Sequence, residues 1–249
     1  MIYVLTRAVC LALFKVLWRP VVVGRENIPP DGPLILASNH LSFIDSIVIP
    51  LSVPRRVVFL AKAEYWEGRS LASLPRRLFF RTFDAVPVQR EQQRDAQASL
   101  DLAREVLARG DAFGIYPEGT RSHDGRLYRG KTGVARLAIE TGVPVIPVAV
   151  VGTDIVAPPG KKFGHWTRPK VRFGKPLDFS RYEGLENDRF ILRSATDEIM
   201  YEIMRLSGQE YVDLYAARAK ALDKETARKQ AAMARAEGRG EDRAGDPAA

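Results

Sequence analysis

Two short segments of the chain hold reactive side chains. In residues 38–45 (SNHLSFID), His40 offers an imidazole and Asp45 a carboxylate that can orient it, the pairing that general-base catalysis on a hydroxyl requires. In residues 118–121 (EGTR), a carboxylate, a small flexible turn, a hydroxyl and a guanidinium form the kind of loop that binds an anionic group. Together the segments predict base chemistry on a hydroxyl beside an anion-binding loop.

The spacing of His40 and Asp45 restricts how the two side chains can meet. Positions five apart on a regular helix point about 140° away from each other, so the pair cannot form across one helical face. It can form if His40 lies in the turn before a helix and Asp45 in the first helical turn. This spacing alone is a weak signal, and a capping aspartate beside a loop histidine is the structural alternative.

The composition favours a folded protein with anionic partners. The chain has 249 residues, of which 46% are hydrophobic and 27% charged, enough for one sizeable α/β domain or at most two small ones. Its net charge of +8 suits lipid headgroups, phosphorylated substrates, an acidic carrier protein or nucleic acid, although a generally basic proteome would explain it too. With one cysteine and three histidines, neither an internal disulfide nor a metal site is expected.

The N-terminal segment requires a test for membrane insertion. Residues 8–18 are apolar but interrupted by Lys15, whereas a spanning helix needs about 20 almost uncharged residues. No small-residue cleavage site follows, so a signal peptide is not predicted. Two interpretations stay open, an amphipathic helix in the membrane interface and a helix packed on the domain's own core. The basic charge favours the first, with residues 1–19 as the membrane-associating segment.

Short apolar runs alternate with amphipathic segments over most of the chain. The predicted strands are 33–38, 57–61, 85–88, 112–116, 143–151 and 170–173. The predicted helices are one that starts at a capping box of Ser42 and Asp45, then 71–83, 93–109, 132–141 and 186–206. Pro144 and Pro147 predict that their strand lies at a sheet edge or carries a bulge.

This alternation predicts an α/β fold, a single domain over residues 20–215 with a mixed, largely parallel sheet flanked by helices. Chemistry in such sheets collects at the carboxyl ends of the strands. The residues that follow predicted strands are His40, Lys62, Arg90 and Glu118. Residues 216–249 are expected to be a charged tail, helical to about residue 237 and disordered beyond.

Four ordered blocks resemble the glycerolipid acyltransferase family typified by 1-acylglycerol-3-phosphate acyltransferase. They are Asn39-His40 through Asp45, residues 86–90 (VPVQR), residues 117–122 (PEGTRS) and residues 143–148 (VPVIPV). The resemblance covers roughly residues 20–180, and four blocks in order make a chance match improbable. Tyr116 stands where phenylalanine is common in the family, and Gln89 where an acidic residue often precedes the arginine.

The resemblance implies a mechanism without an acyl-enzyme. His40 would be the general base, oriented by Asp45, and the deprotonated hydroxyl would attack an acyl thioester directly. The absence of a Gly-x-Ser-x-Gly nucleophile motif agrees with this.

The resemblance also implies an acceptor site. Arg121 and Arg90 would bind the phosphate of the acceptor, with Lys62 as a third cation. Glu118 and Gly119 would shape the pocket, Glu118 by fixing Arg121. A backbone amide near Gly119 and Thr120 would stabilise the oxyanion. Lys131 is interpreted as a solvated lysine at the start of a helix.

The expected function is transfer of a fatty acyl group from acyl-CoA or acyl carrier protein to the free hydroxyl of a lysophospholipid. The expected acceptor is 1-acylglycerol-3-phosphate, which would give phosphatidic acid without a cofactor. The expected location is peripheral or monotopic at the cytoplasmic face of a membrane, with a bacterial inner membrane as the favoured case. The alternatives are another lysolipid or glycolipid acceptor and a non-catalytic lipid-binding protein. Nucleic acid is not an expected partner, because the basic residues are dispersed and no recognition motif is present.

Overall fold

The computed structural model describes residues 19–62, 86–88, 93–158, 164–165, 167–226 and 228–230, together with the isolated residues 12 and 16. For residues 60–62, 86–88 and 93–96, only the backbone is described. The predictions for the N-terminal segment, the helix over 71–83, Arg90 and the end of the charged tail fall outside these residues.

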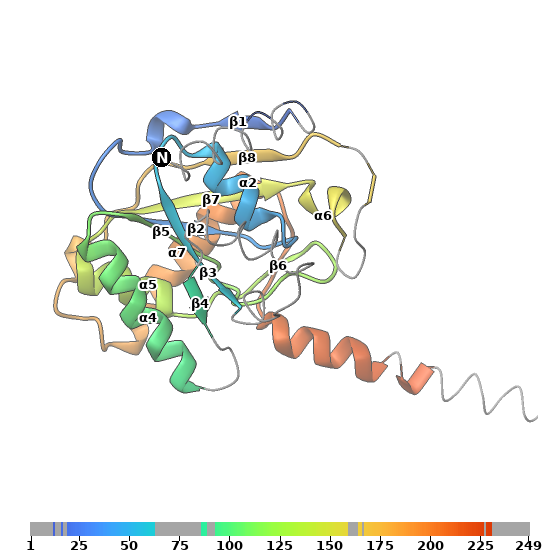
Figure 1. Cartoon of the computed structure of the whole chain (residues 1–249). Coiled ribbons are helices and arrows are strands. Elements are labelled where there is room, and N and C mark those ends of the chain that lie inside the picture. Colours follow the sequence, from blue (N-terminus) through green and yellow to red (C-terminus); the bar gives the residue numbers. More distant parts are fainter. Residues whose placement is uncertain are drawn as a thin grey trace, which may run out of the picture.

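A seven-stranded sheet forms the centre of the domain, in the order β1-β8-β7-β2-β5-β3-β4 (Figure 1). Its strands are β1 (Val21–Val23), β2 (Leu34–Ser38), β3 (Val57–Lys62), β4 (Val86–Val88), β5 (Ala112–Ile115), β7 (Val145–Val151) and β8 (Lys170–Phe173). Only β7 and β8 pair antiparallel, and the other neighbours in the sheet run parallel. The predicted mixed, largely parallel sheet is therefore confirmed.

Helices cover both faces of this sheet (Figure 1). They are α2 (Asp45–Ser52), α4 (Gln93–Ala108), α5 (Gly133–Thr141), the short α6 (Thr153–Val156) and α7 (Arg189–Ser207), with 3-10 turns η1 (Arg25–Asn27) and η4 (Ser180–Tyr182). Alternate residues of β2 enter different cores. Ile35 and Ala37 pack with α4, α5 and α7, whereas Leu34 and Leu36 pack with α2. A strand buried on both faces reads as a continuous apolar run, which is how the sequence signalled it.

Two sequence predictions were wrong in detail. The strand with the two prolines is not at an edge, because β7 lies between β2 and β8, and its residues pair one to one with both neighbours, without a bulge. The Pro147 carbonyl accepts from Gly174 N at 2.8 Å, so the missing N–H of Pro147 faces the β8 side at the point where that ladder ends. The predicted capping box forms only in its carboxylate half: Ser42 N donates to Asp45 Oδ2 at 2.8 Å, but the Ser42 hydroxyl donates to Ala157 O and the cap position of α2 is Ile44.

The chain downstream of α7 pairs with the segment that follows β5. Gly208 ends α7 in the left-handed conformation at φ 73°, and its N–H donates to Met204 O. The next residues form β9 (Tyr211–Val212), which pairs in parallel with β6 (Leu127–Tyr128). Residues 216–226 and 228–230 are helical. No helix within the described ranges is long and apolar enough to cross a bilayer.

Candidate active site

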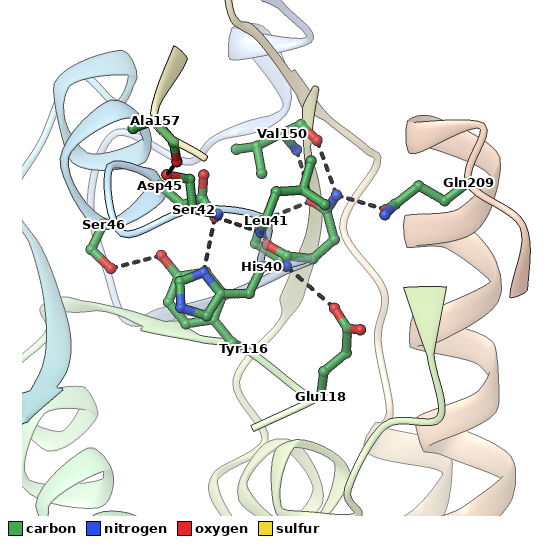
Figure 2. A network of polar contacts seen from close by, with 12 residues as sticks. His40, Leu41, Ser42, Asp45, Ser46, Tyr116, Glu118, Val150, Ala157 and Gln209 are labelled. Carbon is green, nitrogen blue, oxygen red and sulfur yellow. Dashed lines mark hydrogen bonds and ion pairs between the residues drawn. The ribbon is translucent and has the colours of Figure 1, made fainter. Parts of the chain in front are cut away.

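The site lies at the carboxyl ends of β2 and β5, which are parallel neighbours in the sheet. His40 comes two residues after β2, and Glu118 comes three residues after β5. β7 lies on the other side of β2. Figure 2 shows the side chains that these strands bring together around His40. The predicted convergence of His40 and Glu118 at strand ends is confirmed by direct contact between the two segments.

Asp45 holds the His40 ring in the arrangement that the sequence required. His40 Nδ1 lies 2.9 Å from Asp45 Oδ2, with Asp45 fully buried at the first position of α2. The same oxygen accepts from the backbone amides of Leu41 at 2.7 Å and Ser42 at 2.8 Å. These two backbone bonds hold the Asp45 carboxylate in place independently of its contact with the His40 ring. A carboxylate on Nδ1 favours the tautomer that carries its proton there, leaving Nε2 as the basic nitrogen.

The sequence folds this way locally because Asp45 replaces a conventional helix cap. Its carboxylate accepts from amides of the turn that precedes α2, and a negative charge in the first helical turn is favourable. Ser42 contributes differently, since its Oγ donates to Ala157 O at 2.6 Å. The His40 loop is thus attached to the segment that follows α6.

Tyr116 covers one face of the imidazole. The two rings are stacked, and the Tyr116 hydroxyl lies 2.8 Å from Ser46 Oγ on α2. His40 keeps 9% of its surface exposed, and within the described part of the chain nothing hydrogen bonds to Nε2. Sequence reasoning missed this contact, for which the only local signal was an aromatic residue directly after a buried strand.

Glu118 is buried and contacts the backbone of two segments. Its Oε1 accepts from His40 N at 3.3 Å and its Oε2 from Tyr128 N at 2.9 Å. Burial raises the pKa of Glu118 to about 7, against the lowering effect of these two amides. The prediction that Glu118 fixes Arg121 was wrong, because both carboxylate oxygens point inward to amides. Glu118 instead joins the His40 loop to the strand that follows the EGTR segment.

The EGTR segment turns tightly and exposes its basic residue. Gly119 has φ 72°, and its N–H donates to Tyr116 O at 2.9 Å. A Cβ placed on Gly119 would lie 3.0 Å from Lys131 Cε and Nζ, so the lysine side chain lies against this turn. Arg121 is exposed, and Ser122 N donates to His40 O at 2.8 Å. Lys131 is exposed just before α5, as predicted for a solvated lysine, and it also lies beside Gly119.

The remaining predicted residues lie at the same edge or outside the described chain. Lys62 is the last residue of β3, beside Val88 of β4, and only its backbone is described. Thr120 is half-buried between Gly119 and Arg121. Among the described residues, no group of three His, Cys, Asp or Glu side chains is placed to hold a metal ion.

Comparison with known protein families shows which family has this fold and these site segments. The family model described as Acyltransferase matches residues 19–151, more than half of the chain and the part that contains β2, β5 and both site segments. The chain belongs to this acyltransferase family.

Individual relatives agree with this membership. The chain is 32% identical over 174 residues to the chloroplastic 1-acyl-sn-glycerol-3-phosphate acyltransferase of Arabidopsis thaliana, over 67% of this chain but 46% of that one. It is 27% identical to the 1-acyl-sn-glycerol-3-phosphate acyltransferase of Bacillus subtilis, over 76% of this chain and 88% of the relative. The chain thus spans less than half the length of the plant relative.

A solved structure shares the fold. The crystal structure of the 1-acyl-sn-glycerophosphate acyltransferase PlsC from Thermotoga maritima superposes with a TM-score of 0.58 at 27% identity. The match covers 80% of this chain and 77% of that one.

Proposed function

We propose that the protein transfers a fatty acyl group from acyl-CoA or acyl carrier protein to the free hydroxyl of 1-acylglycerol-3-phosphate. The products are phosphatidic acid and the free thiol. The observation that carries the proposal is the buried Asp45 carboxylate on His40 Nδ1, which leaves Nε2 as the basic nitrogen of a segment whose backbone also contacts the loop of the exposed Arg121. The names of the relatives support the choice of acceptor.

The proton balance follows from the ring geometry. His40 Nε2 takes the proton of the acceptor hydroxyl while that oxygen attacks the thioester carbonyl carbon. The Asp45 carboxylate stabilises the resulting imidazolium, whose Nδ1 it already contacts. When the tetrahedral intermediate collapses, the carbon–sulfur bond breaks and Nε2 returns its proton to the thiolate. The thioester is already activated, so the reaction needs no cofactor.

The EGTR segment supplies the acceptor site. Arg121 binds the phosphate through its guanidinium, and Lys131 adds positive charge beside Gly119. A backbone amide at Gly119 or Thr120 stabilises the oxyanion. Lys62 ends β3 beside Val88 of β4, and Arg90 comes two positions after Val88 in the sequence; we propose both as further cations for the acceptor.

We also propose that residues 1–19 place the enzyme on the cytoplasmic face of a membrane. The amphipathic pattern of this segment and the net charge of +8 support attachment to an anionic surface. Co-sedimentation with vesicles containing anionic lipid, with and without residues 1–18, tests this directly. Unchanged binding after the deletion would contradict it.

The decisive test is an acyl-transfer assay of the purified protein. The acceptors are 1-acylglycerol-3-phosphate, other lysophospholipids and phosphate-free monoacylglycerol, each with acyl-CoA and with acyl carrier protein as donor. We expect the highest turnover with 1-acylglycerol-3-phosphate. A preference for another lysolipid would contradict 1-acylglycerol-3-phosphate as the acceptor. Binding without transfer to any acceptor would indicate a lipid-binding protein.

A further inference from the structure

Gln209 links the two halves of the site from a distant part of the chain. It follows Gly208, whose left-handed conformation ends α7. Its side-chain oxygen accepts from Asn39 Nδ2 at 2.7 Å, and its side-chain nitrogen donates to Gly125 O at 2.6 Å. Figure 2 shows Gln209 reaching from the end of α7 toward the His40 loop.

The Asn39 end of this bridge is rigid. Asn39 directly precedes His40 and is fully buried. Its Oδ1 accepts from Val150 N at 2.8 Å and its Nδ2 donates to Val150 O at 2.9 Å, so the side chain continues the pairing of β2 with β7. Gln209 takes the second N–H of the same amide, which leaves Asn39 no alternative orientation with equal hydrogen bonding.

The Gly125 end belongs to the loop that carries the phosphate-binding residue. Gly125 N donates to Ser122 Oγ at 3.1 Å, and Ser122 follows Arg121 in the chain. Ser122 N also donates to His40 O. The loop from Arg121 to Gly125 is therefore tied to the His40 segment directly through Ser122 and indirectly through Gln209.

The pairing beyond Gln209 reinforces the contact. Leu127 N donates to Glu210 O at 2.9 Å, and Leu127 then pairs with Tyr211 at the start of the β6–β9 ladder. The segment after α7 thus runs beside the chain that leaves the EGTR loop, with Gln209 as its first point of contact.

We infer that Gln209 is a positioning residue that sets the separation between the His40 base and the Arg121 loop. The inference rests on the proposed function. A hydroxyl at His40 and a phosphate at Arg121 must then be a fixed distance apart in the acceptor. The site therefore discriminates between acceptors that differ only in how far the free hydroxyl lies from the phosphate.

Two ether-linked isomers provide matched probes. In 1-O-alkyl-glycerol-3-phosphate the free hydroxyl is one carbon closer to the phosphate than in 2-O-alkyl-glycerol-3-phosphate, and ether chains do not migrate. Both are assayed with acyl-CoA. Gln209→Leu removes both bonds of the bridge, whereas Gln209→Glu keeps an acceptor for Asn39 and places a carboxylate against the Gly125 carbonyl. Glu210→Gln alters the exposed neighbouring side chain and serves as control.

We expect the wild-type protein to prefer the 1-O-alkyl isomer. In Gln209→Leu the ratio of kcat/KM between the isomers falls about fivefold or more, because a loosened loop tolerates both spacings. Gln209→Glu changes the ratio in the same direction, and Glu210→Gln leaves it unchanged. An unchanged ratio in Gln209→Leu would overturn the inference even if total activity fell together with Tm, since that result describes a stability effect alone.

Hydrogen exchange separates this inference from the proposed function. The Ser122 amide, which donates to His40 O, should exchange at least about tenfold faster in Gln209→Leu, without any need for turnover. If the wild-type protein acylates neither isomer, the proposed function fails. Faster exchange at Ser122 would then still support the role of Gln209 in holding the loop, and unchanged exchange would overturn it.

Discussion

The ring of Tyr116 lies parallel to the ring of His40, with centroids 3.8 Å apart and planes inclined by 9°. Asp45 holds one edge of the imidazole and Tyr116 covers one face, so the ring is restrained in two directions. Tyr116 is fixed in turn by Ser46 on the same helix that begins with Asp45. The His40 ring is therefore positioned by a short strand end and a helix start, not by loop residues alone.

Substitution of Tyr116 should separate the ring contact from the hydroxyl contact. Tyr116→Phe keeps the stack and removes the hydroxyl that meets Ser46, so kcat should stay within about twofold of wild type. Tyr116→Ala removes the stack, worth about 1 kcal/mol, and should lower kcat roughly fivefold. Steady-state kinetics measure both. Equal losses in the two variants would show that the hydroxyl, not the ring, supports His40.

Asp45→Asn tests the charge on the buried carboxylate without changing its shape. The amide oxygen can still accept from the Leu41 and Ser42 amides, and the NH₂ group takes the place of Oδ1, which has no partner among the described residues. The variant should therefore fold. Its kcat should fall by about 10²–10⁴, the range of general acid–base contributions, because nothing stabilises the imidazolium. Thermal unfolding is the folding control, and wild-type kcat in a folded variant would remove Asp45 from the mechanism.

Glu118 should make stability depend on pH in a defined window. The folded protein holds this proton up to a pKa of about 7, whereas the unfolded chain releases it near the ordinary value of 4.5. More protons are bound in the folded state between these values, so stability falls as pH rises through this window. Glu118→Gln removes the effect. The Tm of wild type relative to Glu118→Gln should decrease from pH 5 to pH 7.5, about the limits of that window.

The control for this measurement is Glu183→Gln, which changes an exposed carboxylate. Its Tm should follow wild type across the same pH range. A difference between wild type and Glu118→Gln that stays constant, or grows with pH, would mean that the amides of His40 and Tyr128 outweigh burial and keep Glu118 ionised.

Arg121→Ala should affect acceptors according to their phosphate. A hydrogen bond to a charged group contributes about 1.5–3 kcal/mol, so kcat/KM for 1-acylglycerol-3-phosphate should fall roughly 10–100-fold. Activity with monoacylglycerol should change about twofold at most, since no phosphate is present. Arg181→Ala removes the same charge from an exposed ion pair with Glu198 and is the control. Equal losses on both acceptors would remove the phosphate role of Arg121.

The sequence predicted the central strands β2, β5 and β7 because they are buried on both faces, whereas the largely exposed β1 was missed. Continuous apolar runs such as residues 33–38 have few alternatives to a strand inside an α/β domain. The two-residue strands β6 and β9 have no such signal, since they form only when the chain after α7 meets the EGTR loop. The edge prediction for β7 failed because Pro147 lies where its ladder with β8 ends, a register that no local pattern encodes.

In the candidate site, too, local contacts could be predicted from the sequence and contacts between distant segments could not. The pairing of His40 with Asp45 was predictable because five residues and one turn determine it. The partners of Glu118 were not, because its sequence neighbour Arg121 offered a simpler interpretation than two backbone amides. Gln209 lies 170 positions from Asn39, and a single glutamine after a helix carries no sign of that contact.

The most direct measurement of the central claim is the rate of 1-acylglycerol-3-phosphate acylation by purified His40→Ala, with acyl-CoA as donor. His165→Ala, which removes an exposed histidine, is the control, and Tm verifies folding of both. We predict that His40→Ala lowers kcat by about 10²–10⁴ with little change in Tm, while His165→Ala stays near wild type. A folded His40→Ala protein with near-normal turnover would contradict the assignment of His40 as the base.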